Sequence, residues 1–349
     1  MVIRSRTPTR IDFAGGTTDL AAFASVEGGA VINAAVNRYA YCTYTPSAQA
    51  GVRIVSQDLE EFVEAADIRD LEYDGNLDLL KAAVRQMNLE GGMQISVRCE
   101  APPGSGTGSS ASVGVALLGL LDYLRAFDQG HEHSKLSRFE IADMACDLEH
   151  ELGIVGGKQD QYAAACGGLS YMTFEDPEVT VEPLTPSRDF ILELEKSLLL
   201  VYTGKSRLSG DIISTVMDAY LRNETAMTEP LMNLRDAGHQ MRDAIVAEDL
   251  VRVGEVLDRN WENQKRLYES MTTPKIEALM AMARGEGVLG GKACGAGGGG
   301  CIVLLCEPDR EHLVRRSVED LGGHIIDFSF DYDGLTVWQS VKGRNGESS

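Results

Sequence analysis

Several short segments in the first half of the chain show the residue patterns of β-strands. Residues 94–100 alternate apolar and polar positions, the pattern of a strand with one buried face. Residues 31–45 are rich in β-branched and aromatic side chains and predict one or two strands. Residues 169–174 predict one more. The first half therefore contains a β-sheet.

Two longer segments repeat apolar residues every three or four positions, which is the spacing of one face of an α-helix. Residues 110–126 form the more apolar of these stripes, and residues 138–152 form a second. Both lie between predicted strands, so helices are expected to cover the sheet.

The second half mixes the same two patterns in a different order. An apolar strand at 197–202 precedes a largely helical region, 208–284, which Pro230 and Pro274 interrupt. Strand signals follow at 301–306, 324–330 and 335–341, with a helix at 310–321. Strands and helices do not alternate regularly, and this predicts an α+β fold.

A looser stretch, 175–189, separates the two halves and contains three prolines and several acidic residues. Such composition is typical of a domain boundary. We therefore expect two domains, residues 1–185 and 186–349.

The charge of the chain limits its partners. Its 349 residues include 32 Lys and Arg against 53 Asp and Glu, a formal net charge of −21. A field of this sign repels nucleic acid and anionic membrane surfaces, so neither is an expected partner. It also repels nucleotides and sugar phosphates. A phosphate site here must therefore depend on local geometry.

Cysteine usage and the apolar runs predict a cytoplasmic protein. The seven cysteines are scattered without a C-x-x-C pair, which argues against a disulfide framework or a zinc site. The first residues lack the apolar segment of a signal peptide, and no uncharged apolar run reaches 18 residues.

The strongest local signal is the glycine-rich segment 102–111, which leads directly into the apolar helix. Alternating glycines let a backbone approach an anion, and the first turn of a helix adds free N–H donors. The segment has neither the Walker lysine nor the Rossmann glycine spacing. It predicts a phosphate site made of Pro103, Gly104, Ser105, Gly106, Thr107, Gly108, Ser109 and Ser110.

This segment resembles the second motif of the GHMP kinases, small-molecule kinases that include galactokinase and mevalonate kinase. Residues 8–20 resemble the family's N-terminal substrate motif, and residues 292–301 resemble its C-terminal glycine motif. Residues 157–162 resemble the segment with the family's catalytic aspartate. The motifs occur in the family's order and cover nearly the whole chain.

Within the family, the motifs look most like those of the D-glycero-D-manno-heptose 7-phosphate kinases, which phosphorylate the anomeric 1-OH. The chain has Thr9 and Thr17 where that group usually has Leu and Gly. The resemblance implies a fold with an N-terminal domain like ribosomal protein S5 domain 2 and a ferredoxin-like C-terminal domain. It also implies ATP and Mg²⁺ as cofactors and a sugar or sugar phosphate as substrate.

Two residues match the family's catalytic positions. Asp160 matches the catalytic base that accepts the proton of the acceptor hydroxyl. From the residues alone, Asp160 is as well explained as a helix cap. Arg10 matches the arginine beside the acceptor, where it would keep Asp160 ionised. A surface arginine at a strand end is the alternative.

Other residues match substrate or metal positions. The substrate set comprises Arg10, Gly15, Gly16, Asp19, Lys158, Asp160 and Gly297. Asp19 would bind sugar hydroxyls, with a cap for the following helix as the alternative. Ser110 and Glu149 match the magnesium ligands, and Glu151 competes with Glu149. Arg207 is a weaker candidate for an anionic substrate group.

Three functions remain open from the sequence. The first is a kinase of the anomeric hydroxyl of a heptose 7-phosphate. The second is a 1-kinase of an unphosphorylated sugar of the fucose or galactose type. The third is a non-catalytic sugar or nucleotide sensor on the same fold, although the joint presence of Arg10, Glu149 and Asp160 favours an enzyme.

Overall fold

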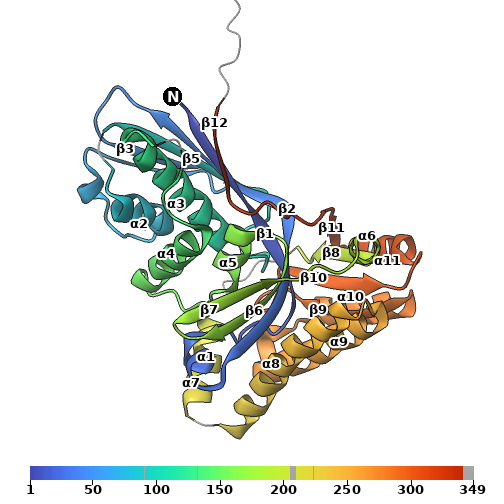
Figure 1. Ribbon diagram of the computed structural model, residues 1–349. Coiled ribbons are helices and arrows are strands. Elements are labelled where there is room, and N and C mark those ends of the chain that lie inside the picture. The colour runs from blue at the N-terminus through green and yellow to red at the C-terminus, as the bar shows by residue number, and fades with distance from the viewer. Residues whose placement is uncertain (90, 132, 205–209, 223, 341–349) are drawn as a thin grey trace, which may run out of the picture.

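Two β-sheets with helices packed against them make up the molecule (Figure 1). The computed structural model describes residues 1–89, 91–131, 133–204, 210–222 and 224–340. Helices and strands occur in both halves, so the predicted α+β class is confirmed.

The first sheet has eight strands, in the order β12-β1-β2-β5-β3-β4, with β6 and β7 continuing from β2. Its strands are β1 (Ile3–Ala14), β2 (Gly29–Pro46), β3 (Val52–Ser56), β4 (Glu61–Ala65), β5 (Met93–Cys99), β6 (Leu169–Glu175), β7 (Glu178–Pro183) and β12 (Thr336–Gln339). The long β2 pairs with β6 through its first part and with β5 through its last part. The predicted strands at 31–45, 94–100 and 169–174 are confirmed.

The second sheet is antiparallel, in the order β11-β8-β10-β9. Its strands are β8 (Leu198–Tyr202), β9 (Val288–Ala293), β10 (Cys301–Cys306) and β11 (His324–Ile326). Both faces of β8 are covered: Leu198 and Leu200 pack towards β1, and Leu199 and Val201 pack towards Trp261. This strand is therefore apolar throughout, as its sequence shows.

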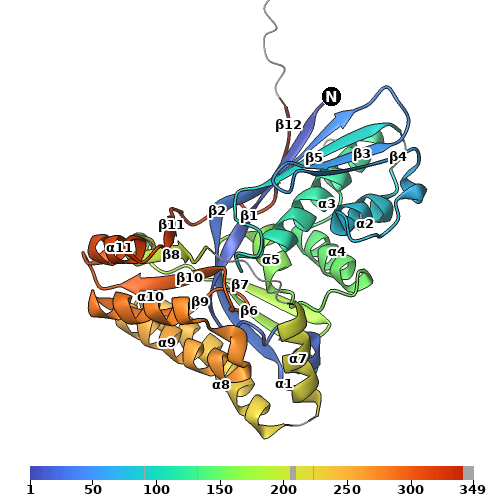
Figure 2. The same ribbon diagram turned by 180° about the vertical axis from the view of Figure 1, so that it is seen from behind.

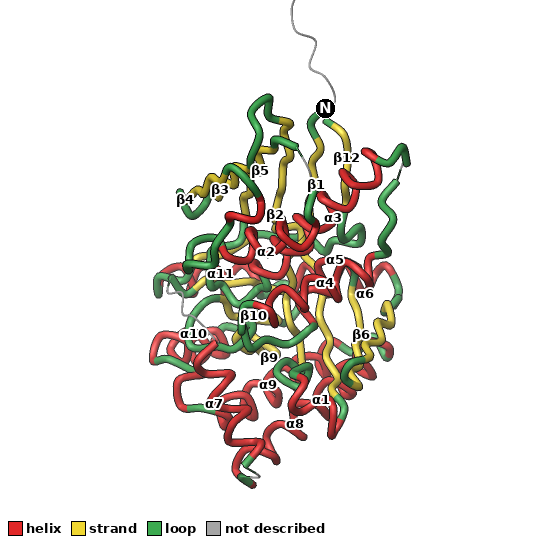
Figure 3. Tube along the Cα trace, turned by 90° about the vertical axis from the view of Figure 1, so that its left-hand side faces the viewer, coloured by secondary structure: helices red, strands yellow, loops and turns green. Residues whose placement is uncertain are grey.

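The helices divide between the two sheets (Figures 1 and 2). They are α1 (Ala21–Glu27), α2 (Asp78–Met87), α3 (Ser109–Asp128), α4 (Arg138–Glu151), α5 (Gln159–Cys166), α6 (Arg188–Ser197), α7 (Gly210–Leu221), α8 (Thr225–Val246), α9 (Leu250–Leu267), α10 (Pro274–Gly285) and α11 (Glu311–Asp320), with short 3₁₀ turns η1 (Ile68–Asp70) and η2 (Glu269–Met271). Helices α2 to α5 share one apolar core with the first sheet, and residues of α9, α10 and α11 share another with the second. In the side view α7 and α8 lie at the end opposite β12 (Figure 3).

The sequence patterns missed several elements, among them β3, β4, β7, β9, α2 and α6. Strand β1 has polar residues on both faces, and β9 contains two glycines and a lysine, so neither shows the alternation of a strand. Helix α6 begins inside the proline-containing stretch that predicted a boundary. The segment predicted at 324–330 is a strand only at His324–Ile326.

Strand β12 pairs with β1 and so joins the first sheet, although it lies far along the second half of the chain. The division at residues 185 and 186 falls between β7 and α6 and stays a prediction.

Helix α3 is the one described helix long and apolar enough by composition to span a membrane. Its apolar window is 72% buried inside the molecule, which is the behaviour of a central core helix. The cytoplasmic location stays a prediction.

Candidate active site

A change of side-chain direction along β1 brings Arg10 to the site. Before the change, the hydroxyls of Ser5 and Thr7 donate to carbonyls of α3, at 2.6 and 2.7 Å. The pairing register with β2 then shifts after Pro8, and Arg10 faces α5 while Ile11 enters the core on the other face of the sheet. Such irregularities commonly re-aim side chains beside active sites.

Arg10 and Asp160 form a partly buried ion pair, with Arg10 the more deeply buried partner. Asp160 Oδ1 lies 2.8 Å from Arg10 Nε and 2.6 Å from a terminal guanidinium nitrogen, and Arg10 also donates to the Gly106 carbonyl. Burial raises the pKa of Asp160, and Arg10 opposes that shift. Burial alone would lower the pKa of Arg10, but Asp160 and Asp12 together raise it. Arg10 is 4% exposed, so the surface-arginine alternative is wrong.

Asp160 lies in the first turn of α5, whose N-cap residue is Lys158. The alternative that Asp160 caps this helix is therefore wrong. Both guanidinium contacts reach Oδ1. The other oxygen, Oδ2, lies 3.0 Å from the point that a Cβ on Gly108 would occupy, so the glycine leaves that oxygen accessible from the loop.

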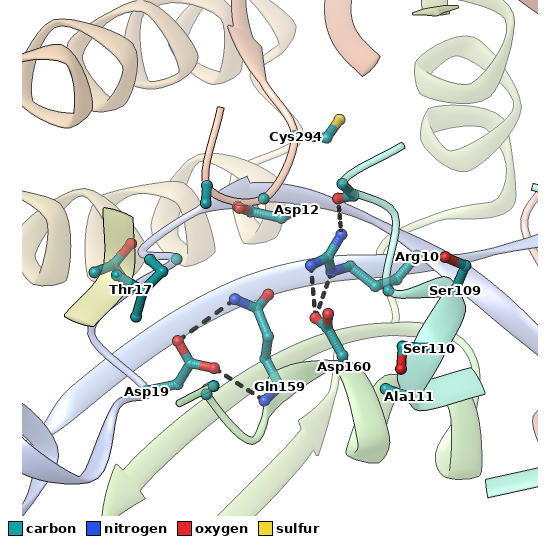
Figure 4. A pocket seen from close by; sticks show the side chains of 18 of the residues that line it. Arg10, Asp12, Thr17, Asp19, Ser109, Ser110, Ala111, Gln159, Asp160 and Cys294 are labelled. Carbon is teal, nitrogen blue, oxygen red and sulfur yellow. Dashed lines mark hydrogen bonds and ion pairs between the residues drawn. The ribbon is translucent and has the colours of Figure 1, made fainter. Parts of the chain in front are cut away.

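The glycine-rich segment forms a loop that ends at the N-terminus of α3 (Figure 4). Gly104, Gly106 and Gly108 have φ values of 65°, 76° and 74°, which side chains rarely tolerate. These glycines line the cavity together with Ser109 and Ser110. Of the other predicted residues, Pro103 does not line it, and the buried Ser105 and Thr107 bond to each other, 2.7 Å apart.

The C-terminal glycine motif packs directly on this loop. The backbone N–H of Cys301 donates to the Ser105 carbonyl at 2.7 Å. A Cβ on Gly106 would lie 2.5 Å from the Cys294 carbonyl oxygen, and a Cβ on Gly300 would lie 2.5 Å from the Ser105 carbonyl oxygen. Glycine is therefore required on both sides of the contact, because the two backbones touch. Gly297, predicted to bind substrate, also lines the cavity.

Asp19 reaches across the cavity to the start of α5. Its carboxylate accepts from the Gln159 backbone N–H at 3.0 Å and from the Gln159 amide at 3.5 Å. It makes no capping bond to α1, so that alternative is wrong. A Cβ on Gly157 would lie 1.9 Å from Asp19. Burial, with repulsion from Asp160 and Asp12, raises the pKa of Asp19 to about 6.

Thr17 holds an unusual backbone conformation beside these residues. Its φ is 82°, a value that a β-branched residue adopts only under strain, and it lines the cavity. Gly16 has no such φ, but a Cβ there would lie 2.5 Å from Asp12 Oδ2. Gly15 does not line the cavity and packs instead against the Ala30 carbonyl.

The predicted metal ligands both line the cavity, Ser110 from α3 and Glu149 from α4. Glu149 accepts a 2.9 Å hydrogen bond from the Gln161 amide, and burial together with Asp160 raises its pKa to about 7. The competing Glu151 accepts instead from the Tyr73 hydroxyl at 2.8 Å and does not line the cavity.

Lys158, one of the predicted substrate residues, is not brought to this site. Lys158 pairs with Asp176 at 2.5 Å, donates to the Pro177 carbonyl and does not line the cavity. Arg207 lies outside the described residues.

A buried ion pair that the sequence patterns missed lies behind Arg10. Lys292 Nζ lies 2.9 Å from Asp12 Oδ2 and 3.1 Å from the Asp12 carbonyl oxygen. The two residues are 0% and 1% exposed. Asp12 stands between Ile11 and Phe13, and Lys292 stands between Gly291 and Ala293. These neighbours could have indicated that each charge is buried, but not which residue is its partner.

The cavity has a volume of about 320 Å³. Four carboxylate residues line it, namely Asp12, Asp19, Glu149 and Asp160, against one cation, Arg10, within the part of the chain that the structure describes.

Two family models match the chain. The model of the GHMP kinases N terminal domain matches residues 77–168, and the model of the GHMP kinases C terminal region matches residues 241–324. The chain belongs to the GHMP kinase family. The first match contains the glycine loop and Asp160, and the second contains Lys292 and the C-terminal glycine motif. This GHMP kinase therefore has the two-part architecture that the resemblance implied.

Relatives extend the similarity over the full length of this GHMP kinase. A D-glycero-alpha-D-manno-heptose 7-phosphate kinase of Campylobacter jejuni is 28% identical, over 97% of this chain and 99% of its own. The crystal structure of a D-glycero-D-manno-heptose 1-phosphate kinase from Bacteroides thetaiotaomicron is 28% identical with a TM-score of 0.80, covering 97% and 99%. An L-fucokinase/L-fucose-1-P guanylyltransferase of Bacteroides fragilis is 26% identical over 90% of this chain, which covers 35% of that longer protein.

Proposed function

We propose that this GHMP kinase transfers a phosphoryl group from ATP to the anomeric 1-OH of a heptose 7-phosphate, D-glycero-D-manno-heptose 7-phosphate. The observation that supports the transfer is the meeting of two parts in one cavity: the Arg10–Asp160 pair and the glycine loop at the start of α3. The heptose substrate is suggested by the relatives that match over nearly their whole length.

The glycine loop would bind the ATP phosphates with uncharged donors. Positive φ values turn successive N–H groups into a concave surface, and the N-terminus of α3 adds the unpaired donors of its first turn. These groups attract phosphate at short range without requiring a basic surface. This explains how a chain with a net charge of −21 could bind a nucleotide.

Asp160 would accept the proton of the acceptor hydroxyl at Oδ2, while Arg10 holds the carboxylate in position through Oδ1. Burial raises the pKa of Asp160, which makes it a stronger base once ionised. The guanidinium also lies where it can offset negative charge on the transferring group. Positioning and charge compensation of this kind account for most of the catalysis of phosphoryl transfer.

The residues around Glu149 fit a magnesium ion. A buried carboxylate with a raised pKa gains stability when a cation approaches, and Ser110 supplies a hydroxyl oxygen on the same cavity. The described residues contain no cluster of three or more His, Cys, Asp or Glu suited to a metal. Glu149 and Ser110 would therefore bind an ion whose remaining ligands are phosphate oxygens and water. Magnesium supplies charge neutralisation on the phosphates.

One observation favours a second candidate, a 1-kinase of an unphosphorylated sugar of the fucose type. Arg10 is the only cation among the described residues that line the cavity, and Asp160 already pairs with it. A substrate phosphate would have to bind backbone donors, such as those of the C-terminal glycine motif. The partial match to a fucokinase is consistent with this candidate.

The two candidates differ in one experiment. Purified protein with Mg-ATP is tested by coupled ADP release on a panel of sugars and their phosphates, with the phosphorylated position assigned by ³¹P NMR. We expect turnover of the heptose 7-phosphate and a phosphate on its anomeric carbon. Turnover of unphosphorylated sugars alone would favour the second candidate, and no turnover of any sugar would reject both.

A further inference from the structure

A second pair of opposite charges adjoins the Arg10–Asp160 pair. Arg10 and Asp12 stand two positions apart on β1, so their side chains leave the same face of the strand, and both line the cavity (Figure 4). Asp12 is 1% exposed, and Lys292 of β9, which is 0% exposed, has its Nζ 2.9 Å from Asp12 Oδ2. Charges of alternating sign therefore follow one another from α5 to β9, in the order Asp160, Arg10, Asp12 and Lys292.

Arg10 lies near two carboxylates but bonds to only one of them. Its Nε and one terminal nitrogen contact Asp160 Oδ1 at 2.8 and 2.6 Å, and it also donates to the Gly106 carbonyl. Burial lowers the pKa of Arg10, and the charges of Asp160 and Asp12 raise it again. Asp12, however, gives its Oδ2 and its backbone carbonyl to Lys292. The direction of the guanidinium therefore depends on which cation pairs with Asp12.

The charge of Asp12 also acts on Asp160. Burial is the main cause that raises the pKa of Asp160, Arg10 opposes this rise, and the negative charge of Asp12 adds to it. Without a cationic partner, Asp12 would attract the guanidinium away from Asp160 and would also favour the protonated form of that carboxyl group. Lys292 opposes both effects, because its ammonium group compensates Asp12 from β9.

We propose that Lys292 is a positioning residue of the catalytic site, which holds Asp12 and so leaves Arg10 to Asp160. This rests on the proposed function, since it takes Asp160 to be the base. Lys292 does not line the cavity, so it acts through Asp12 and Arg10 and not on a reactant. It belongs to the segment of the C-terminal glycine motif. The second half of the chain thus supplies the charge that orients a pair formed by residues of the first half.

Two single substitutions leave opposite charges at this place. Lys292→Met leaves Asp12 negative and uncompensated, and Asp12→Asn leaves Lys292 positive and uncompensated. Both destabilise the fold, so a loss of activity alone does not separate a positioning role from a structural one. The readout is therefore the acid limb of the pH profile of kcat/KM for the sugar, at saturating Mg-ATP. Rates are normalised to the folded fraction, which circular dichroism measures at each pH.

The two acid limbs should move in opposite directions. In Lys292→Met we expect a shift to higher pH by about 0.5–1 unit, because a nearby negative charge favours the protonated carboxyl group. In Asp12→Asn we expect a shift to lower pH, because an unpaired ammonium group favours the carboxylate. The double variant Asp12→Asn/Lys292→Met has neither charge, so its acid limb should return towards that of the wild type.

The turnover number gives a second readout. In Lys292→Met the guanidinium should turn towards Asp12 and hold Asp160 less well, so kcat at the pH optimum should fall about 10-fold or more. The double variant should recover part of this loss. If Lys292→Met does not fold, the shift of Asp12→Asn to lower pH relative to the double variant decides.

The other ionisable groups around the pair are the same in all of these proteins. They are Asp19 from the segment after β1, Glu149 from α4 and Cys294 at the end of β9. Opposite shifts of the acid limb must therefore come from the charges at positions 12 and 292.

Lys81→Met is the matched control. Lys81 is the other described lysine that is almost fully buried, at 1% exposure, and it pairs with Asp78 at 3.1 Å but does not line the cavity. It should keep the wild-type acid limb. If the wild type is active but the limbs of Lys292→Met and Asp12→Asn stay in place or move in the same direction, the positioning role alone is overturned. A wild type that turns over no sugar would overturn the role together with the proposed function.

Discussion

The raised pKa of Glu149 predicts that this side chain destabilises the protein at neutral pH. Burial is the larger cause of the shift and repulsion from Asp160 is the smaller one. Together they raise the pKa of Glu149 from its ordinary 4.5 to about 7. At about 1.36 kcal/mol for each pKa unit, ionisation of Glu149 costs the folded state up to about 3 kcal/mol. The side chain is not fully buried, so the measured value should be somewhat smaller.

The change of the free energy of unfolding with pH depends on how many protons the folded and unfolded states bind. Between pH 4.5 and 7 the folded state holds a proton on Glu149 that the unfolded state has lost, so the free energy of unfolding falls as pH rises through this window. Asp19, whose pKa is raised to about 6, contributes in the same direction between its ordinary value of 3.8 and pH 6. We therefore expect the unliganded protein to be more stable at pH 5 than at pH 8.

Glu149→Gln tests this reasoning directly. The glutamine can still accept the 2.9 Å bond from Gln161 but cannot ionise. In urea unfolding at pH 5 to 8, without magnesium or nucleotide, the variant should gain about 2–3 kcal/mol over the wild type at pH 8 and little at pH 5. Its magnesium-dependent turnover should fall sharply.

Glu151→Gln is the matched control, because Glu151 is an exposed residue two positions along the same helix. It should follow the wild-type pH dependence. If the free energy of unfolding of Glu149→Gln and that of the wild type changed with pH in the same way, Glu149 would not be a buried carboxylate repelled by Asp160.

Four further outcomes follow from the site. Asp160→Asn should lower turnover at least 100-fold while leaving ATP binding measurable by calorimetry, and unchanged turnover would remove Asp160 from the mechanism. Lys292→Met leaves Asp12 buried and unpaired, so its urea midpoint should fall by the equivalent of about 3–5 kcal/mol. Thr17→Gly relieves a strained φ of 82°, so it should raise Tm, which a lower Tm would contradict. Gly16→Ala drives a Cβ into the Asp12 carboxylate, so it should raise the KM for the sugar more than the KM for ATP.

Local features of the site were predictable from the sequence because they depend on short segments. The alternating glycines of the phosphate loop indicated positive φ values and an anion site, and these φ values are present. Helices α3 and α4 were also predictable, because apolar residues recur every three or four positions along both segments. The proximity of Arg10 and Asp160, which are 150 residues apart, came only from the family resemblance.

Other features could not be predicted, because they depend on contacts between distant segments. Nothing near Asp12 in the sequence indicates that its partner is Lys292, 280 residues away. The buried Gln159 is recognisable as a wall residue only once Asp19 is placed beside it. Strand β12 was assigned to the second half, because nothing in the sequence of β12 or of β1 indicates that the two strands pair.

The pairing of β12 with β1 has a consequence for the order in which the protein is made. Strand β1, which presents Arg10 and Asp12, is synthesised long before β12. Its edge opposite β2 stays open until Thr336–Gln339 emerges, and an open edge invites wrong pairing. Strand β1 is thus made well before the strand that pairs with this edge. A chain that ended shortly before residue 336 would contain nearly every site residue, but the edge of β1 that pairs with β12 would be left without a partner strand.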